Sequence, residues 1–112
     1  MLYTIKIEDH SPKPAIKKQG QVLTIEIDLK ARGENNSESA SINTKILSPS
    51  GIEYASTNPQ DVTLSKTYKS FKSTIRVPSS ISPTNIVIKV ELKVNGSTVD
   101  TYGNYNIAIE ND

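Results

Sequence analysis

The sequence predicts an all-β domain in which two sheets pack face to face as a sandwich, and three observations support this fold class. The chain has 112 residues, the size of one ordinary domain. Isoleucine, valine, serine and threonine dominate its composition, and β-branched residues favour strands over helices. Hydrophobic and polar residues alternate along most of the chain, with turn residues between the alternating runs. We therefore interpret residues 1–112 as a single domain of about seven strands without a helix, with a small β-barrel as the alternative.

The first half of the chain contains three clear strands and one hairpin. The expected inner faces of these strands are Tyr3, Ile5 and Ile7, then Leu23, Ile25, Ile27 and Leu29, then Ala40, Ile42, Thr44 and Ile46. Polar or proline-containing loops separate them. Residues 48–51 (Ser-Pro-Ser-Gly) have proline and glycine where a type I turn prefers them. The chain should therefore return in a short strand at residues 52–55.

The second half of the chain contains a stronger turn signal, Asn95-Gly96, which suits a two-residue type I′ hairpin. The register expected about this turn places Val94 opposite Ser97, Leu92 opposite Val99 and Val90 opposite Thr101. On this register Tyr102 points outward. The remaining inner faces are expected to be Phe71, Ser73, Ile75 and Val77, then Ile86, Ile88, Val90, Leu92 and Val94, then Tyr105, Ile107 and Ile109.

Four sequence runs resemble bacterial and archaeal immunoglobulin-like modules of the adhesion and macroglobulin types. They are Leu47-x-Pro49-x-Gly51, Phe71-x-x-Thr74-Ile75-x-Val77-Pro78, Ile86-x-Ile88-x-Val90 and Tyr105-x-Ile107-x-Ile109. The chain departs from the pattern at residues 85–88 (Asn-Ile-Val-Ile), where such modules often carry Gly-x-Tyr, and it lacks the Cys and Trp landmarks of antibody domains. The resemblance implies an immunoglobulin-like antiparallel β-sandwich. It implies no particular partner, because the matching residues belong to turns and core.

Composition excludes several classes of function. The chain has no cysteine, which excludes a disulfide scaffold, a Cys-ligated metal site and a thiol nucleophile. A net charge of +1 argues against a nucleic-acid binder. The only histidine, His10, follows Glu8 and Asp9, and no G-x-S-x-G motif is present. We interpret His10 as an exposed residue where the first strand ends, and we expect no catalytic residue, cofactor or metal.

The sequence contains no apolar run long enough for a membrane helix and no signal peptide, so we expect no membrane insertion. These features leave the compartment open. The chain could be a cytosolic product, a viral component, or a domain excised from an exported protein.

The uneven distribution of charge along the chain and the predicted loops indicate candidate contact residues. Residues 62–99 carry six cations and one acid, whereas residues 100–112 carry only acids. The Lys66-x-x-Lys69-x-x-Lys72 run suits an edge strand, where lysines hinder aggregation, or a basic patch for an acidic partner. Further candidate contacts are Tyr102, which lies beside a glycine, and the loop residues Asn58, Pro59, Ser80 and Pro83.

We therefore expect a non-catalytic protein-interaction or structural module, such as a component of a surface, an appendage or a viral particle. It would bind a protein partner or itself through its end loops or an edge strand. The alternative is a small protease inhibitor that presents the loop at residues 56–60 or 79–83 in a rigid form. Carbohydrate binding is less well supported, because the chain has no tryptophan and only 5% aromatic residues.

Overall fold

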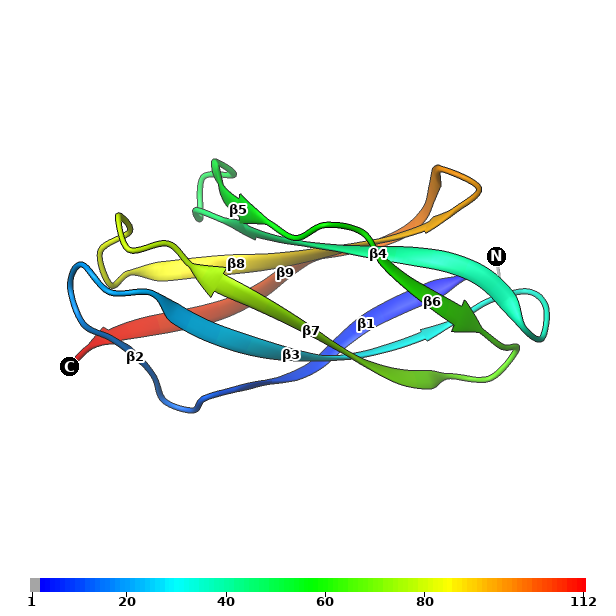
Figure 1. Ribbon diagram of the computed structural model, residues 1–112, viewed down its shortest axis with the longest axis horizontal. Helices are drawn as coiled ribbons and strands as arrows, with labels where there is room; N and C mark the ends of the chain where they lie inside the picture. The colour runs from blue at the N-terminus through cyan, green and yellow to red at the C-terminus, as the bar shows by residue number, and fades with distance from the viewer. Residues whose placement is uncertain (1–2) are drawn as a thin grey trace.

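The structure, a computed structural model, describes residues 3–112 as two β-sheets packed face to face (Figure 1). The first sheet has three strands, in the order β1 (Thr4–Ser11), β3 (Leu23–Arg32) and β7 (Lys69–Val77). The second has six, in the order β2 (Ala15–Lys17), β9 (Ser97–Asn111), β8 (Asn85–Val94), β4 (Glu38–Leu47) and β5 (Glu53–Ser56), with β6 (Gln60–Leu64) also paired to β4. The predicted all-β sandwich of two packed sheets is confirmed. Residues 1 and 2 of the predicted domain lie outside the described residues.

Residues 3–112 form nine strands and no helix, so none of the described segments is a helix that could cross a membrane. The sequence predicted about seven strands, and it missed β2 and β6. These strands have three and five residues, too few to show a repeating alternation. Because β2 runs parallel to β9, the second sheet is mixed rather than wholly antiparallel.

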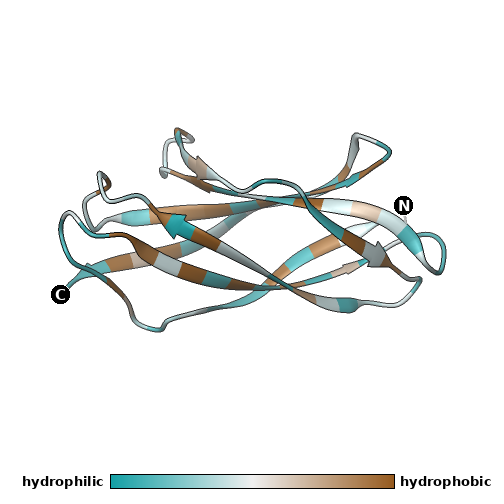
Figure 2. Ribbon diagram, viewed as in Figure 1, coloured by the Kyte–Doolittle hydropathy of each residue, from teal (hydrophilic) through white to brown (hydrophobic). Residues whose placement is uncertain are grey.

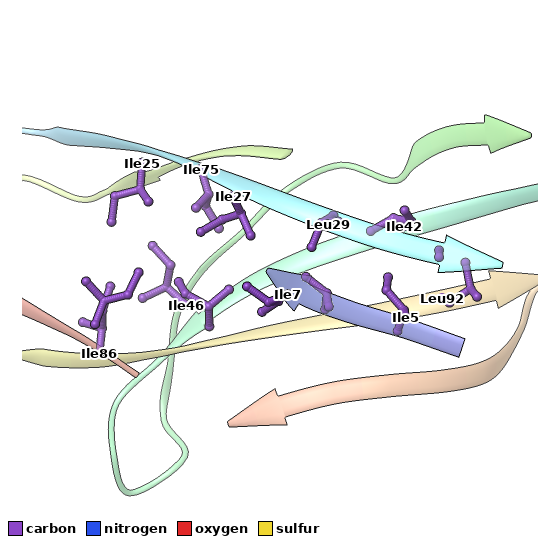
Figure 3. Close-up of a cluster of buried hydrophobic side chains, with 14 of the residues drawn as sticks. Ile5, Ile7, Ile25, Ile27, Leu29, Ile42, Ile46, Ile75, Ile86 and Leu92 are labelled. Carbon is purple, nitrogen blue, oxygen red and sulfur yellow. The ribbon is translucent and has the colours of Figure 1, made fainter. Parts of the chain in front are cut away.

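The core lies between the two sheets and consists mainly of isoleucine (Figure 3). Ile25 and Ile27 on β3 and Ile46 on β4 are fully buried. Every residue that the alternation assigned to an inner face is buried in this cluster or packed against it, so the inner-face prediction is confirmed. Hydrophobic and hydrophilic residues alternate along the strands (Figure 2). Burial of this apolar surface is the main source of stability for such a fold.

Both predicted turns are present. Asn95 and Gly96 have φ angles of 52° and 79°, the positive values that a type I′ turn requires. In the other turn the Gly51 backbone N–H donates to the Ser48 carbonyl at 2.9 Å, which returns the chain into β5. Glycine is needed at position 51 because its φ is 96°.

The register between β8 and β9 differs from the prediction beyond the first pair. Val94 lies opposite Ser97 as predicted, but a bulge then places Leu92 opposite Asp100 and Val90 opposite Tyr102. A second bulge places Ile88 opposite Tyr105. The predicted pairs of Leu92 with Val99 and of Val90 with Thr101 are therefore wrong.

These two bulges explain why Tyr102 was misassigned. Each bulge adds one residue to β9 and reverses which residues face the core. Between the bulges, Tyr102 is therefore half-buried and packed against the core, rather than pointing outward. After the second bulge the original parity returns, and Ile107 and Ile109 are buried as predicted.

Candidate functional site

The strand β7 forms an open edge of the first sheet. It pairs with β3 along its whole length, and no other strand among residues 3–112 pairs with it. The strand that precedes it, β6, pairs instead with β4 in the second sheet. The predicted edge-strand position of Lys69 and Lys72 is therefore confirmed. On its outer side β7 presents backbone N–H and C=O groups without a strand partner in the described chain.

The side chains of β7 divide sharply between the two faces of the sheet. Ser73, Ile75 and Val77 are buried in the core, whereas Lys72 and Arg76 are exposed. Lys72 donates to the Glu26 carboxylate on β3 at 3.2 Å, and this hydrogen bond raises the pKa of Lys72. The open edge is thus bordered by cations on its solvent face.

Two cations lie over the ring of Tyr68, the residue just before β7. The Lys6 Nζ lies 4.8 Å from the ring centroid and the Arg32 Cζ lies 4.9 Å from it, both within cation–π range. The Tyr68 hydroxyl accepts a hydrogen bond from Thr4 Oγ1 at 3.0 Å. This bond, followed by the charges of Lys6 and Arg32, lowers the pKa of Tyr68. We refer to Lys6, Arg32, Lys66 and Tyr68 as the basic cluster.

Strand register brings the basic cluster together from three distant segments. Thr4 on β1 lies opposite Arg32 on β3, and Lys6 is two residues further along the same face of β1. Tyr68 arrives from the connection before β7, whose first residue, Lys69, lies opposite Ala31. The cluster is therefore a product of sheet pairing rather than of one sequence motif.

A depression of about 210 Å³ adjoins the basic cluster and is lined by Arg32, Gly33, Glu34 and Lys66. The Arg32 Nε is buried and has no hydrogen-bond partner in the described chain. Within residues 3–112, no carboxylate lies within 4.0 Å of the charged groups of Lys6, Arg32 or Lys66. Three cations, Lys6, Arg32 and Lys66, stand here against two acids, Glu34 and Glu38, and the Glu38 carboxylate lies against Gly33 in the wall of the depression.

The loop that carries Glu34 is held in place by Glu38. The Glu38 carboxylate accepts hydrogen bonds from the Tyr3 hydroxyl and, at 3.2 Å each, from the backbone N–H groups of Glu34 and Asn35. The bond to Glu38 raises the pKa of Tyr3 to about 12 and lowers the pKa of Glu38. The charge of Glu34 adds to the rise in the pKa of Tyr3. One wall of the depression is therefore fixed by charge-assisted hydrogen bonds.

The predicted contact residues do not form one surface. Lys66 lines the depression, and Lys69 and Lys72 follow on β7. The loop with Ser80 and Pro83 lies at the other end of the sandwich, between β7 and β8 (Figure 1). Asn58 and Pro59 are exposed beside β4, where the neighbouring Thr57 backbone N–H donates to the Thr44 carbonyl at 2.9 Å. Tyr102, on β9 of the second sheet, packs against the core between the two sheets.

The predicted exposed position of His10 is wrong. His10 lies within β1 and is half-buried, with its Nδ1 2.7 Å from the Tyr105 hydroxyl on β9. The two rings pack edge to face at 5.6 Å. Burial lowers the pKa of His10. This histidine was predicted to be exposed because no local pattern indicates that Tyr105 of β9 would pack against its ring.

The two acids that precede His10 are engaged by other groups, and the Asp9 carboxylate also accepts a hydrogen bond from the His10 backbone N–H at 2.8 Å. The Asp9 carboxylate pairs with Lys13, which lowers the pKa of Asp9, and the Glu8 carboxylate pairs with Lys30 at 2.9 Å. Nowhere between residues 3 and 112 do three or more His, Asp or Glu side chains group as metal ligands would.

Sequence reasoning missed the contributions of Lys6, Arg32 and Tyr68 to the basic cluster. Lys6 and Arg32 each stand at an outward position of an alternating strand, which is the usual place for a solvated charge. Only the register between β1 and β3 shows that the two side chains meet at one tyrosine.

Comparisons with known proteins identify the fold. No protein-family model matches the chain, and no curated protein matches it significantly. Among solved structures, it is similar to a protein assigned as a β-galactosidase from Bacteroides fragilis, with a TM-score of 0.65 and 12% identity. It is also similar to a glycosyl hydrolase family 2 member from Bacteroides cellulosilyticus, with a TM-score of 0.67 and 11% identity. The two alignments cover 96% and 95% of this chain.

This chain spans only 16% and 14% of the length of those two proteins. A third similar structure is a CARDB domain from Pyrococcus furiosus in complex with di-metal ions, with a TM-score of 0.53 and 14% identity. That alignment covers 96% of this chain and 89% of the other. At these identities the likeness establishes a shared β-sandwich fold and nothing about function.

Proposed function

We propose that this chain is a non-catalytic protein-interaction module that receives an extended segment of its partner along the open edge of β7. The observation that carries this proposal is the pairing of β7, which has nine residues joined to β3 on one side only. Such an edge offers main-chain donors and acceptors at strand spacing, the arrangement used when a peptide adds a strand to a sheet.

The charge of β7 favours a partner of opposite charge over a second copy of this chain. Lys69, Lys72 and Arg76 lie on this one strand. If two copies paired through β7, their like charges would repel each other, which is how natural edge strands avoid aggregation. An acidic partner segment would instead be attracted to the same strand.

Two further observations support a non-catalytic role. The one histidine is engaged by Tyr105 and half-buried, which does not suit a general base. The enzymes of similar structure are several times longer than this chain, so the likeness is to one domain-sized portion of each. We infer that the chain is a module of the immunoglobulin-like type found in adhesins and macroglobulins, and that it serves in a surface, appendage or particle assembly.

A displayed library of random peptides, selected on the immobilised protein, tests this function. We expect the selected peptides to be extended and acidic, and to slow hydrogen exchange of amides in β7. Arg76→Glu should weaken their binding, whereas Lys93→Glu, which makes the same charge change on β8, should not. Peptides that bind only at the loops of residues 57–59 or 78–84 would overturn the proposal and favour a loop-presenting inhibitor.

A further inference from the structure

We propose that the basic cluster is a binding site for the side-chain carboxylate of an acidic residue in the partner peptide. This inference rests on the proposed function, because the peptide that pairs with β7 would bring the carboxylate to the cluster. It also has an independent basis in the geometry of Arg32, the charge balance of the depression and its position beside Tyr68.

Arg32 has an unused donor at this site. Its Nε is buried and makes no hydrogen bond within the described chain, although a buried donor without a partner is costly. The Arg32 Cζ lies 4.9 Å from the centroid of the Tyr68 ring, a cation–π contact that favours this position of the guanidinium. Because the Nε is buried, an incoming carboxylate would meet the terminal Nη groups of the guanidinium, whose two N–H donors it accepts with both of its oxygens.

The local charge also favours an anion. Lys66 lines the depression with Arg32, and Lys6 lies on the Tyr68 ring beside it. The opposing charges are those of Glu34 and Glu38, and the Glu38 carboxylate is already engaged by hydrogen bonds from the Tyr3 hydroxyl and the backbone N–H groups of Glu34 and Asn35. A cationic site whose positive groups lack acidic partners attracts an anion from outside the chain.

Size and position favour a peptide side chain over a larger ligand. A depression of about 210 Å³ has room for one carboxylate group and a few waters, since each water occupies about 30 Å³. It lies beside Tyr68, and the next residue, Lys69, is the first residue of β7. Because Lys66 lines the depression and lies three residues before Lys69, a peptide paired with β7 would end near the depression.

The test is a titration of the isotope-labelled chain with a capped decaglutamate peptide, with decaglutamine as the uncharged control. The Nε–H group of Arg32 can be observed directly by NMR. We expect decaglutamate to shift this resonance and decaglutamine to leave it unchanged. A sulfated dextran serves as a second anionic polymer. If the dextran shifts Arg32 at lower concentration than decaglutamate does, the assignment to an acidic peptide is wrong.

Substitutions then assign the binding to the cluster. Arg32→Met and the exposed Lys66→Ala should each weaken decaglutamate binding, the first by about tenfold. Glu34→Gln should strengthen it by about twofold, because it removes one opposing charge. Lys93→Ala, which removes one cation from another part of the surface, should change the affinity by less than any of these. Equal losses of decaglutamate affinity for Lys66→Ala and Lys93→Ala would overturn the site. Because Lys66 is exposed, we expect Lys66→Ala to fold like the wild type.

The same titration separates this site from the proposed function. If decaglutamate slows exchange of β7 amides but leaves the Arg32 Nε–H unchanged, the carboxylate site is wrong and the edge-pairing function stands. If the Arg32 Nε–H shifts while β7 exchange stays fast, the carboxylate site is supported and the edge-pairing function is wrong.

Discussion

The hydroxyl oxygens of Thr44 and Ser73 lie 2.7 Å apart in the buried space between the two sheets. Thr44 comes from β4 in the second sheet and Ser73 from β7 in the first, and both residues are buried. Most of the buried core residues are aliphatic. This hydrogen bond therefore ties the candidate binding strand to the opposite sheet.

Ser73→Ala should lower the free energy of unfolding by about 1–3 kcal/mol, because the Thr44 hydroxyl then remains buried without its partner. The double variant Thr44→Val/Ser73→Ala should regain much of that loss, because no polar group is then left unpaired. Urea denaturation of the wild type, both single variants and the double variant measures the interaction free energy between Thr44 and Ser73. Strictly additive losses would show that the two hydroxyls do not depend on each other.

The burial of His10 predicts a dependence of stability on pH. Because burial lowers the pKa of His10 in the fold, the unfolded chain binds more protons than the folded chain just below the unfolded pKa of about 6.5. The free energy of unfolding should therefore fall as the pH drops from about 7.5 to about 5.5. Below the folded pKa both states are protonated and this contribution levels off.

His10→Gln should remove this part of the pH dependence, as measured by urea denaturation at the two pH values. The lowered pKa values of Asp9 and Glu38 also reduce the free energy of unfolding in acid. They do so only near and below pH about 4, because the carboxyl groups of the unfolded chain take up protons there. The histidine contribution is therefore separate from theirs. An equal loss of stability in the wild type and in His10→Gln would show that His10 is not the group responsible.

Lys17 on β2 has a buried side chain whose charge is offset only by one long hydrogen bond among the described residues. The residue is only 2% exposed, and within residues 3–112 the one hydrogen bond from its Nζ goes to the Lys18 carbonyl, at 3.5 Å. Lys17→Met keeps much of the side-chain volume and removes the desolvation cost, so it should stabilise the fold by about 1–3 kcal/mol. Thermal unfolding checks this, with the exposed Lys18→Met as the control. A lower midpoint for Lys17→Met would indicate an additional interaction of the ammonium group.

The isoleucine core accounts for most of the stability. Ile46→Ala should lower the free energy of unfolding by about 2–5 kcal/mol, because Ile46 is fully buried between the sheets. Ile52 in the turn before β5 is 64% exposed, and Ile52→Ala should change the same quantity by no more than about 0.5 kcal/mol. Denaturant titration compares the two variants. Similar effects of both would contradict the packing described here.

The alternation of residues was enough to predict which side chains form the core. It succeeded on β3, β4, β7 and β8 because each is nine or ten residues long and buries one face. It failed at Tyr102 because nothing in the residues of β9 marks a bulge. A single extra residue reverses the face of every side chain that follows it.

The candidate site was predictable only in part. Lys69 and Lys72 were assigned correctly to an edge strand, since lysine is common there, whereas Lys66 lies in the bend before that strand. Lys6 and Arg32 are far apart in the sequence, and their meeting at Tyr68 depends on the order β1-β3-β7. Such long-range pairing leaves no local signal in a single sequence.

The most direct test of the central claim is residue-resolved hydrogen exchange across β3 and β7, with and without decaglutamate. In the free protein we expect slow exchange throughout β3, which has neighbours on both sides, and alternating slow and fast exchange along β7, which has one. Decaglutamate should slow the fast amides of β7 and leave β3 unchanged. Uniformly slow exchange along β7 in the free protein, or fast β7 amides that the peptide does not affect, would contradict a function that works through this edge.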